Sequence, residues 1–81
     1  MRLPRDLSGD ELAALLRRYG YAATRQTGSH LRLTTQQNGE HHLSLPRHSS
    51  LRVGTLNAIL KDVADHLGLE YDALLRALFE H

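Results

Sequence analysis

Two segments in the middle of the chain, in which leucines alternate with polar side chains, constrain the fold most. The alternation covers residues 30–35 and returns in residues 40–45, with a polar turn at 36–39 between them. An alternation with a period of two residues is typical of a β-strand that buries one face. The two segments therefore predict an antiparallel hairpin with one apolar and one polar face.

The length of the turn decides which residues pair across this hairpin. A two-residue turn would place Leu33 opposite Ser44 and mix apolar and polar side chains on one face. A three-residue loop, 37–39, pairs Leu33 with Leu43 and gives Gly39 the left-handed position. We expect the three-residue loop.

This register also predicts which residues gather at the open end of the hairpin. His30 then lies opposite Pro46, and the polar face brings His30 towards Arg47 and His48. An imidazole titrates near neutral pH and can accept or donate a proton. We therefore expect a phosphate and a reacting proton to meet at this end of the sheet.

Helical patterns flank the hairpin on both sides. Ser8 and Glu11 have the spacing of a capping box, apolar side chains then recur at helical spacing to Tyr19, and Gly20 ends the pattern. Residues 21–26 are weakly strand-like.

The second half of the chain contains the clearest helical pattern. An apolar stripe runs over residues 56–67 and ends at Gly68, with Gly54 expected as a turn at its entrance and Gly28 as a turn before His30. A shorter stripe follows at 71–78.

The order of these elements predicts an α+β domain, in which a helix, a three-stranded antiparallel sheet and a helix are followed by an added short C-terminal helix. We expect a single domain over residues 1–81, with a core of about 8–67 and a helical extension of about 69–80. There are no cysteines, so disulfides and thiolate chemistry are excluded. No apolar run is long enough to cross a membrane, and the first residues lack the pattern of a signal peptide, so we expect a cytoplasmic protein.

The net charge of +1 conceals an uneven distribution of charge. Residues 2–61 contain nine basic side chains and four acidic ones, whereas residues 62–81 contain five acids and one arginine. A basic front is typical of a surface that meets polyanions. The candidate contacts to a nucleic-acid backbone are Arg17, Arg18, Arg25, Arg32, Arg52 and Lys61.

Six histidines raise the question of a metal site. His41 and His42 are neighbours on a strand and point to opposite faces, so they cannot chelate one ion together. No cysteine is present, and no carboxylate other than Glu40 is near them. We expect neither a metal nor another cofactor.

Three short motifs make the chain resemble the HicA family of toxins, which are small mRNA interferases with a double-stranded-RNA-binding-domain-like fold. The resemblance runs from about residue 10 to residue 67. Its motifs are, in chain order, Gly28-Ser29-His30, Pro46-Arg47-His48 and Gly54-Thr55-Leu56.

The resemblance implies a metal-independent endoribonuclease that cleaves mRNA with the histidine that follows Gly-Ser, which is His30 here. It also implies a HicB-like antitoxin that covers the active face, in a complex whose oligomeric arrangement is open. We expect Arg47 to position the phosphate, and Ser29 and His48 to assist in catalysis or phosphate positioning. His48 could instead be a solvated loop histidine.

Two other functions are compatible with the residue pattern. The apolar spacing of residues 63–79 fits a DNA-binding helix-turn-helix, but its second helix carries Glu70, Asp72 and Glu80 against only Arg76. The other function is a non-catalytic module that uses the polar sheet face to bind a partner. The fold alone cannot separate these functions.

Overall fold

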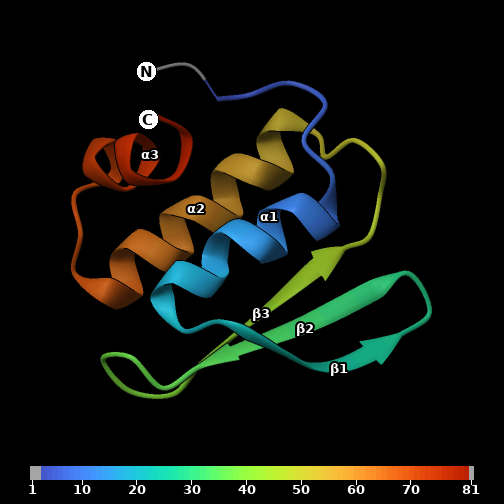
Figure 1. Cartoon of the computed structure of the whole chain (residues 1–81), viewed down its shortest axis with the longest axis horizontal. Helices are drawn as coiled ribbons and strands as arrows, with labels where there is room; N and C mark the ends of the chain where they lie inside the picture. The colour runs from blue at the N-terminus through green and yellow to red at the C-terminus, as the bar shows by residue number, and fades with distance from the viewer. Residues whose placement is uncertain (1–2, 81) are drawn as a thin grey trace.

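The computed structural model describes residues 3–80, which form an α+β domain in the predicted order (Figure 1). The elements are α1 (Gly9–Leu16), the 3-10 turn η1 (Arg17–Tyr19), β1 (Ala22–Thr27), β2 (His30–Thr35), β3 (His41–Pro46), α2 (Val53–Leu67) and α3 (Tyr71–Phe79). The arrangement of a helix, three antiparallel strands and a helix confirms the double-stranded-RNA-binding-domain-like class, with α3 as the added helix.

The three strands form one antiparallel sheet in the order β1-β2-β3. Leu33 pairs with Leu43, and His30 pairs with Pro46, as the sequence predicts. The register is therefore fixed by the leucines, which must all face the core.

The connection between β2 and β3 is longer than the predicted three-residue loop. β2 ends at Thr35 and β3 begins at His41 instead of Glu40, so residues 36–40 lie between the paired positions. Gly39 has a φ of 96°, as predicted, and Asn38 is also left-handed with a φ of 57°. Two consecutive left-handed residues end the pairing early but keep the register.

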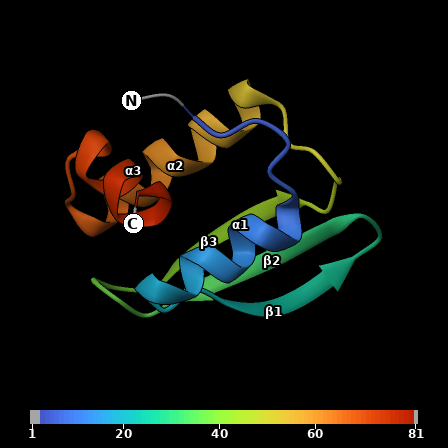
Figure 2. The same ribbon diagram turned by 45° about the horizontal axis from the view of Figure 1, so that its top comes forward.

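The helices cover one face of the sheet only, and Figure 2 shows α1 and α2 lying above it. Beneath them is the core, to which the sheet contributes Leu33, Leu43 and Leu45. The helices contribute Leu12, Leu16, Leu56, Leu60 and Val63. The opposite face of the sheet remains open to solvent.

The start of α1 lies very close to the end of β3. A Cβ atom added at Gly9 would collide with the carbonyl oxygen of Pro46. The N–H of Gly9 donates to the carbonyl oxygen of His48 over 3.0 Å. Glycine is therefore required here by close packing, while Ser8 and Glu11 form the predicted capping box in front of the helix.

The helix entrance predicted at Gly54 is confirmed to within one residue, because α2 begins at Val53; Gly54 lies in the first turn of the helix and does not form a separate turn before it. The chain is held just before the helix, where Leu51 is buried and its N–H donates to the carbonyl oxygen of Leu7 over 2.7 Å. Helical geometry can therefore begin at once after Arg52, without a left-handed glycine.

The last helix packs on the protein's own core. Leu74, Leu75 and Leu78 of α3 are buried in the cluster that also contains the α2 side chains. The guanidinium of Arg18 donates to the carbonyl oxygen of Ala77 near the end of α3. No helix within residues 3–80 has the length and apolar character needed to cross a membrane.

Candidate functional site

The open face of the sheet is lined with polar side chains from all three strands. Side chains alternate along a strand, and the leucines at 31 and 33 face the core, so His30, Arg32 and Thr34 of β2 face the opposite way. His30 and Arg32 are exposed, and Arg25 of β1 is paired directly with Arg32.

His30 is the first residue of β2 and directly follows the turn formed by Gly28 and Ser29. Gly28 has a φ of 57°, a left-handed conformation that side chains disfavour, so glycine at this position allows the tight turn. No atom lies within 4 Å of the position that a Cβ atom would take at Gly28, so glycine is required here by the backbone conformation and not by crowding. The turn presents His30 at the edge of the open face.

A hollow of about 440 Å³ lies on this face beside His30. Arg25, Arg32 and His42 also line it. The hollow therefore combines two guanidinium groups with two imidazoles, which are groups that bind phosphate and transfer protons.

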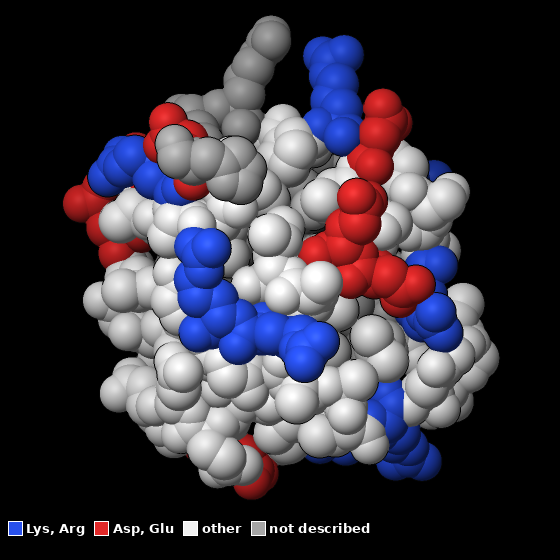
Figure 3. Space-filling model, in the orientation of Figure 1, with Lys and Arg blue, Asp and Glu red and all other residues white. Residues whose placement is uncertain are grey.

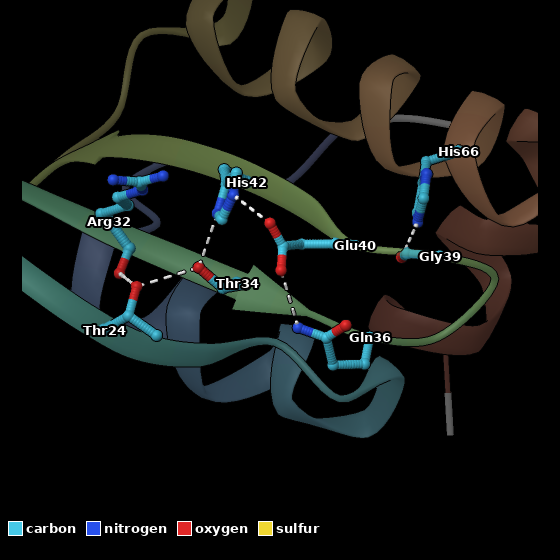
Figure 4. Close-up of polar contacts among 8 residues, drawn as sticks. All are labelled: Thr24, Arg32, Thr34, Gln36, Gly39, Glu40, His42 and His66. Atoms are coloured by element: carbon cyan, nitrogen blue, oxygen red, sulfur yellow. Dashed lines mark hydrogen bonds and ion pairs between the residues drawn. The ribbon is translucent and has the colours of Figure 1, made fainter.

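A chain of hydrogen bonds crosses the open face near this hollow (Figure 4). Thr24 and Thr34 share a hydrogen bond of 2.9 Å between their hydroxyl oxygens, and Thr34 contacts Nδ1 of His42 at 2.8 Å. Nε2 of His42 lies 3.1 Å from a carboxylate oxygen of Glu40, whose other oxygen accepts from the amide of Gln36 at 3.3 Å. His42 is thus held in a defined orientation at one end of the hollow.

The alternation already indicated that His42 lies on the polar face opposite Thr34, but it gave no reason to assign a role to His42. Its contact with Glu40 follows from the β2–β3 connection, residues 36–40, which places Glu40 just before β3. The hydrogen bonds from Gln36 and His42 hold the pKa of the Glu40 carboxyl below its usual value. Glu40 is therefore an ionised group beside the hollow at neutral pH.

The side chain of Arg47 is engaged elsewhere. Its Nε and Nη2 atoms donate to the two carboxylate oxygens of Asp10 at 2.9 and 3.0 Å. These bonds lower the pKa of Asp10 and raise that of Arg47. The backbone N–H of Arg47 donates to the carbonyl oxygen of Ser29 over 2.6 Å, so only its main chain lies beside the His30 turn.

His48 lines a different hollow from His30. The side chains around it include Ser50, Arg52 and Thr55, at the entrance to α2. The structure thus brings the backbones of the two predicted motifs together at the end of the sheet, but His30 and His48 line different hollows there. The roles predicted for Ser29, Arg47 and His48 stay predictions.

Of the six basic residues predicted to contact a nucleic acid, Arg25 and Arg32 lie on the open face. Arg17 lines a groove between α1 and β1 that also contains Asp10, and Arg18 contacts α3. Figure 3 shows that acidic side chains gather over the start of α1, so the helical face carries mixed charge. Lys61 belongs to α2, on the helical side of the sheet.

His41 faces the helices, and its contacts support the fold. His41 contacts the Tyr21 hydroxyl at 2.7 Å through Nδ1 and Asp62 at 3.2 Å through Nε2. Its ring stacks on that of His66, with centroids 4.3 Å apart. Within residues 3–80, no group of three or more histidine, aspartate or glutamate side chains is placed to hold a metal ion.

A helix-covered antiparallel sheet with a basic, histidine-bearing open face places the chain in the double-stranded-RNA-binding-domain-like class of small α+β proteins. Residues 9–64 match the family model described as the HicA toxin of bacterial toxin-antitoxin systems. This match covers more than half of the chain, so the chain belongs to the HicA toxin family. The toxin role and the existence of a toxin-antitoxin partnership follow from the family.

No curated protein and no solved structure matches the chain. The family match ends before α3, which lies at 71–79.

Proposed function

We propose that this toxin is an endoribonuclease that cleaves mRNA without a metal ion and that His30 is its catalytic residue. The observation that carries the proposal is the position of His30 in a hollow that also contains Arg25 and Arg32. The proposal places the protein in the cytoplasm, where mRNA is translated.

The chemistry requires a proton acceptor and a source of positive charge. When the ribose 2′-hydroxyl attacks the adjacent phosphate, the hydroxyl loses a proton and the departing 5′-oxygen gains one. An imidazole can serve either step near neutral pH, and guanidinium groups stabilise the charge that develops on the phosphate oxygens. The attack forms a 2′,3′-cyclic phosphate on one product and leaves a 5′-hydroxyl on the other.

The partner in the toxin-antitoxin pair is, in this proposal, a HicB-like protein that covers the open sheet face. Within residues 3–80 no helix of the toxin occupies this face, so a partner can reach it. Because His30 and its hollow lie on this face, a partner bound there would block the access of RNA to His30. Mutual exclusion of antitoxin and RNA is therefore expected.

The test is cleavage of a defined RNA in excess EDTA by the wild-type protein and by His30→Ala. The wild type should produce 2′,3′-cyclic phosphate ends, and His30→Ala should lose at least about 100-fold in rate because a proton-transfer group is removed. Its far-UV circular dichroism should not change, since His30 is exposed.

Arg76→Ala is the matched control, because Arg76 is an exposed cation on α3, away from the sheet. It should cleave at the wild-type rate. A folded His30→Ala protein with wild-type activity, or a wild type that requires a divalent metal, would contradict the proposal.

A further inference from the structure

Two guanidinium groups face each other across β1 and β2, and the Glu40 carboxylate acts on Arg32 only from beyond ion-pair distance. Arg25 and Arg32 are direct partners in the antiparallel register. Like charges placed directly opposite one another in a sheet are unfavourable. Within residues 3–80 neither forms an ion pair, whereas Arg47 is paired with Asp10. An anion between the two guanidinium groups would remove this repulsion.

This pair lies one step along the sheet from His30. Arg32 is the next residue of β2 on the same face, and such positions are about 6.6 Å apart along a strand. That separation is comparable with the spacing of successive phosphates in an extended nucleic-acid strand. A phosphate beside His30 would therefore place the neighbouring phosphate at Arg25 and Arg32.

His30 and the Arg25–Arg32 pair form a short row, and both ends of this row are closed to further phosphates. At one end, the row stops with His30 because β2 begins there, and the guanidinium of Arg47, which follows the residue paired with His30, is held by Asp10. At the other end are His42 and the ionised carboxylate of Glu40, which would repel a third phosphate.

Within residues 3–80 the open face carries no tyrosine or phenylalanine side chain on which bases could stack. The aromatic side chains of the described residues lie elsewhere, on the helices and in the core: Tyr19, Tyr21, Tyr71 and Phe79. Binding on this face therefore depends on phosphate charge and has little preference for base sequence.

We propose that the open face holds a single RNA strand through two consecutive phosphates, the scissile one beside His30 and its neighbour between Arg25 and Arg32, and that Glu40 limits the site to this length. The assignment of the scissile phosphate rests on the proposed function. We call His30, Arg25 and Arg32 together the binding strip, and RNA can bind to this strip without being cleaved.

The experiment measures the affinity of uncleavable 2′-O-methyl RNA oligonucleotides, two to eight nucleotides long, by fluorescence anisotropy. Affinity should rise from two to three nucleotides, which adds the second phosphate, and should then change little. For two phosphates on a single strand, the logarithm of affinity should fall with the logarithm of salt concentration with a slope of about −1.4.

Three variants test the residues assigned to the strip. Arg25→Ala and Arg32→Ala should each weaken binding about tenfold, and together they should reduce the salt slope by about 0.7 because both contact the same phosphate. Glu40→Gln should tighten binding about threefold for oligonucleotides longer than three nucleotides, because the repulsive charge is removed. Arg76→Ala should bind as the wild type does.

The outcomes separate the strip from the proposed cleavage. Affinity that rises steadily to eight nucleotides, or wild-type binding by Arg25→Ala and Arg32→Ala, overturns the strip even if His30 cleaves RNA. The predicted length limit and variant effects support the strip even if no RNA is cleaved, and in that case the proposed function fails alone.

Discussion

At the scale of single residues, the nearest carboxylate decides what each arginine can do. Arg47 donates two hydrogen bonds to Asp10, so its charge is balanced and it fixes the loop after β3 on α1. Arg25 and Arg32 have no such partner within residues 3–80 and remain able to bind an anion. The same residue type thus supports the fold in one place and a candidate site in another.

Substitution of glycine by alanine should have opposite effects on stability at the starts of α1 and α2. Gly9→Ala should destabilise the protein by about 1–3 kcal/mol, because the new Cβ collides with the backbone of Pro46. Gly54→Ala should stabilise it by about 0.5–1 kcal/mol, because the site is open, helical and free of a left-handed φ. Urea unfolding at pH 7 measures both, and equal effects would show that close packing at Gly9 is not limiting.

At the scale of elements, α3 is part of the hydrophobic core although the family match ends at residue 64. Its buried leucines pack against α2, and Arg18 links η1 to its last turn. Because α3 lies on the helical side, it leaves the open face of the sheet uncovered (Figure 2). The extension therefore stabilises the fold without obstructing His30.

Substitution of one α3 leucine tests this role. Leu74 is fully buried, so Leu74→Ala should reduce the free energy of unfolding by about 2–5 kcal/mol. Leu69→Ala is the control, because Leu69 is 37% exposed and should reduce the free energy of unfolding by about 1 kcal/mol or less. A Leu74→Ala protein as stable as the wild type would mean that α3 does not contribute to the core.

At the scale of the whole molecule, a polar cluster joins the sheet to α2 on the helical side. His41 of β3 contacts the Tyr21 hydroxyl and the Asp62 carboxylate, and it stacks on His66. The Nε2 atom of His66 lies 2.9 Å from the carbonyl oxygen of Gly39, which fixes the β2–β3 connection against α2. This cluster ties together segments that are far apart in the sequence.

Because Tyr21 belongs to this cluster, we expect the protein to lose stability at alkaline pH. Burial, and secondarily the charge of Asp62, raises the pKa of Tyr21 from 10.0 to about 12. Between these values the unfolded chain releases the phenol proton before the folded protein does, so the stability contributed by Tyr21 falls as pH rises above about 10. It is fully present below that pH.

Tyr21→Phe should therefore be less stable than the wild type at pH 7 by about 1 kcal/mol, because the hydrogen bond to His41 is lost. The difference should shrink between pH 10 and 12, as measured by denaturant unfolding across this range. Tyr19→Phe is the control and should keep the alkaline loss of stability. A constant difference between wild type and Tyr21→Phe would show that Tyr21 has the same pKa in the folded and the unfolded protein.

The sequence by itself determined the elements and the register of the hairpin. The leucines at alternate positions allow only one pairing that buries them all, which fixes His30 opposite Pro46. The capping box at Ser8 and the glycine stops act within a few residues, so their effects can be predicted from local spacing. The family motif around His30 was also visible without a structure.

Only the tertiary structure decided which side chains share a site. Arg47 and Asp10 are 37 residues apart, and their pairing depends on how α1 packs across the end of the sheet. The same packing separates His48 from His30 and leaves His42, Arg25 and Arg32 around the hollow beside His30. Strand periodicity fixes the face on which a side chain lies, but long polar side chains choose partners by distance and charge, which only the packed layers set.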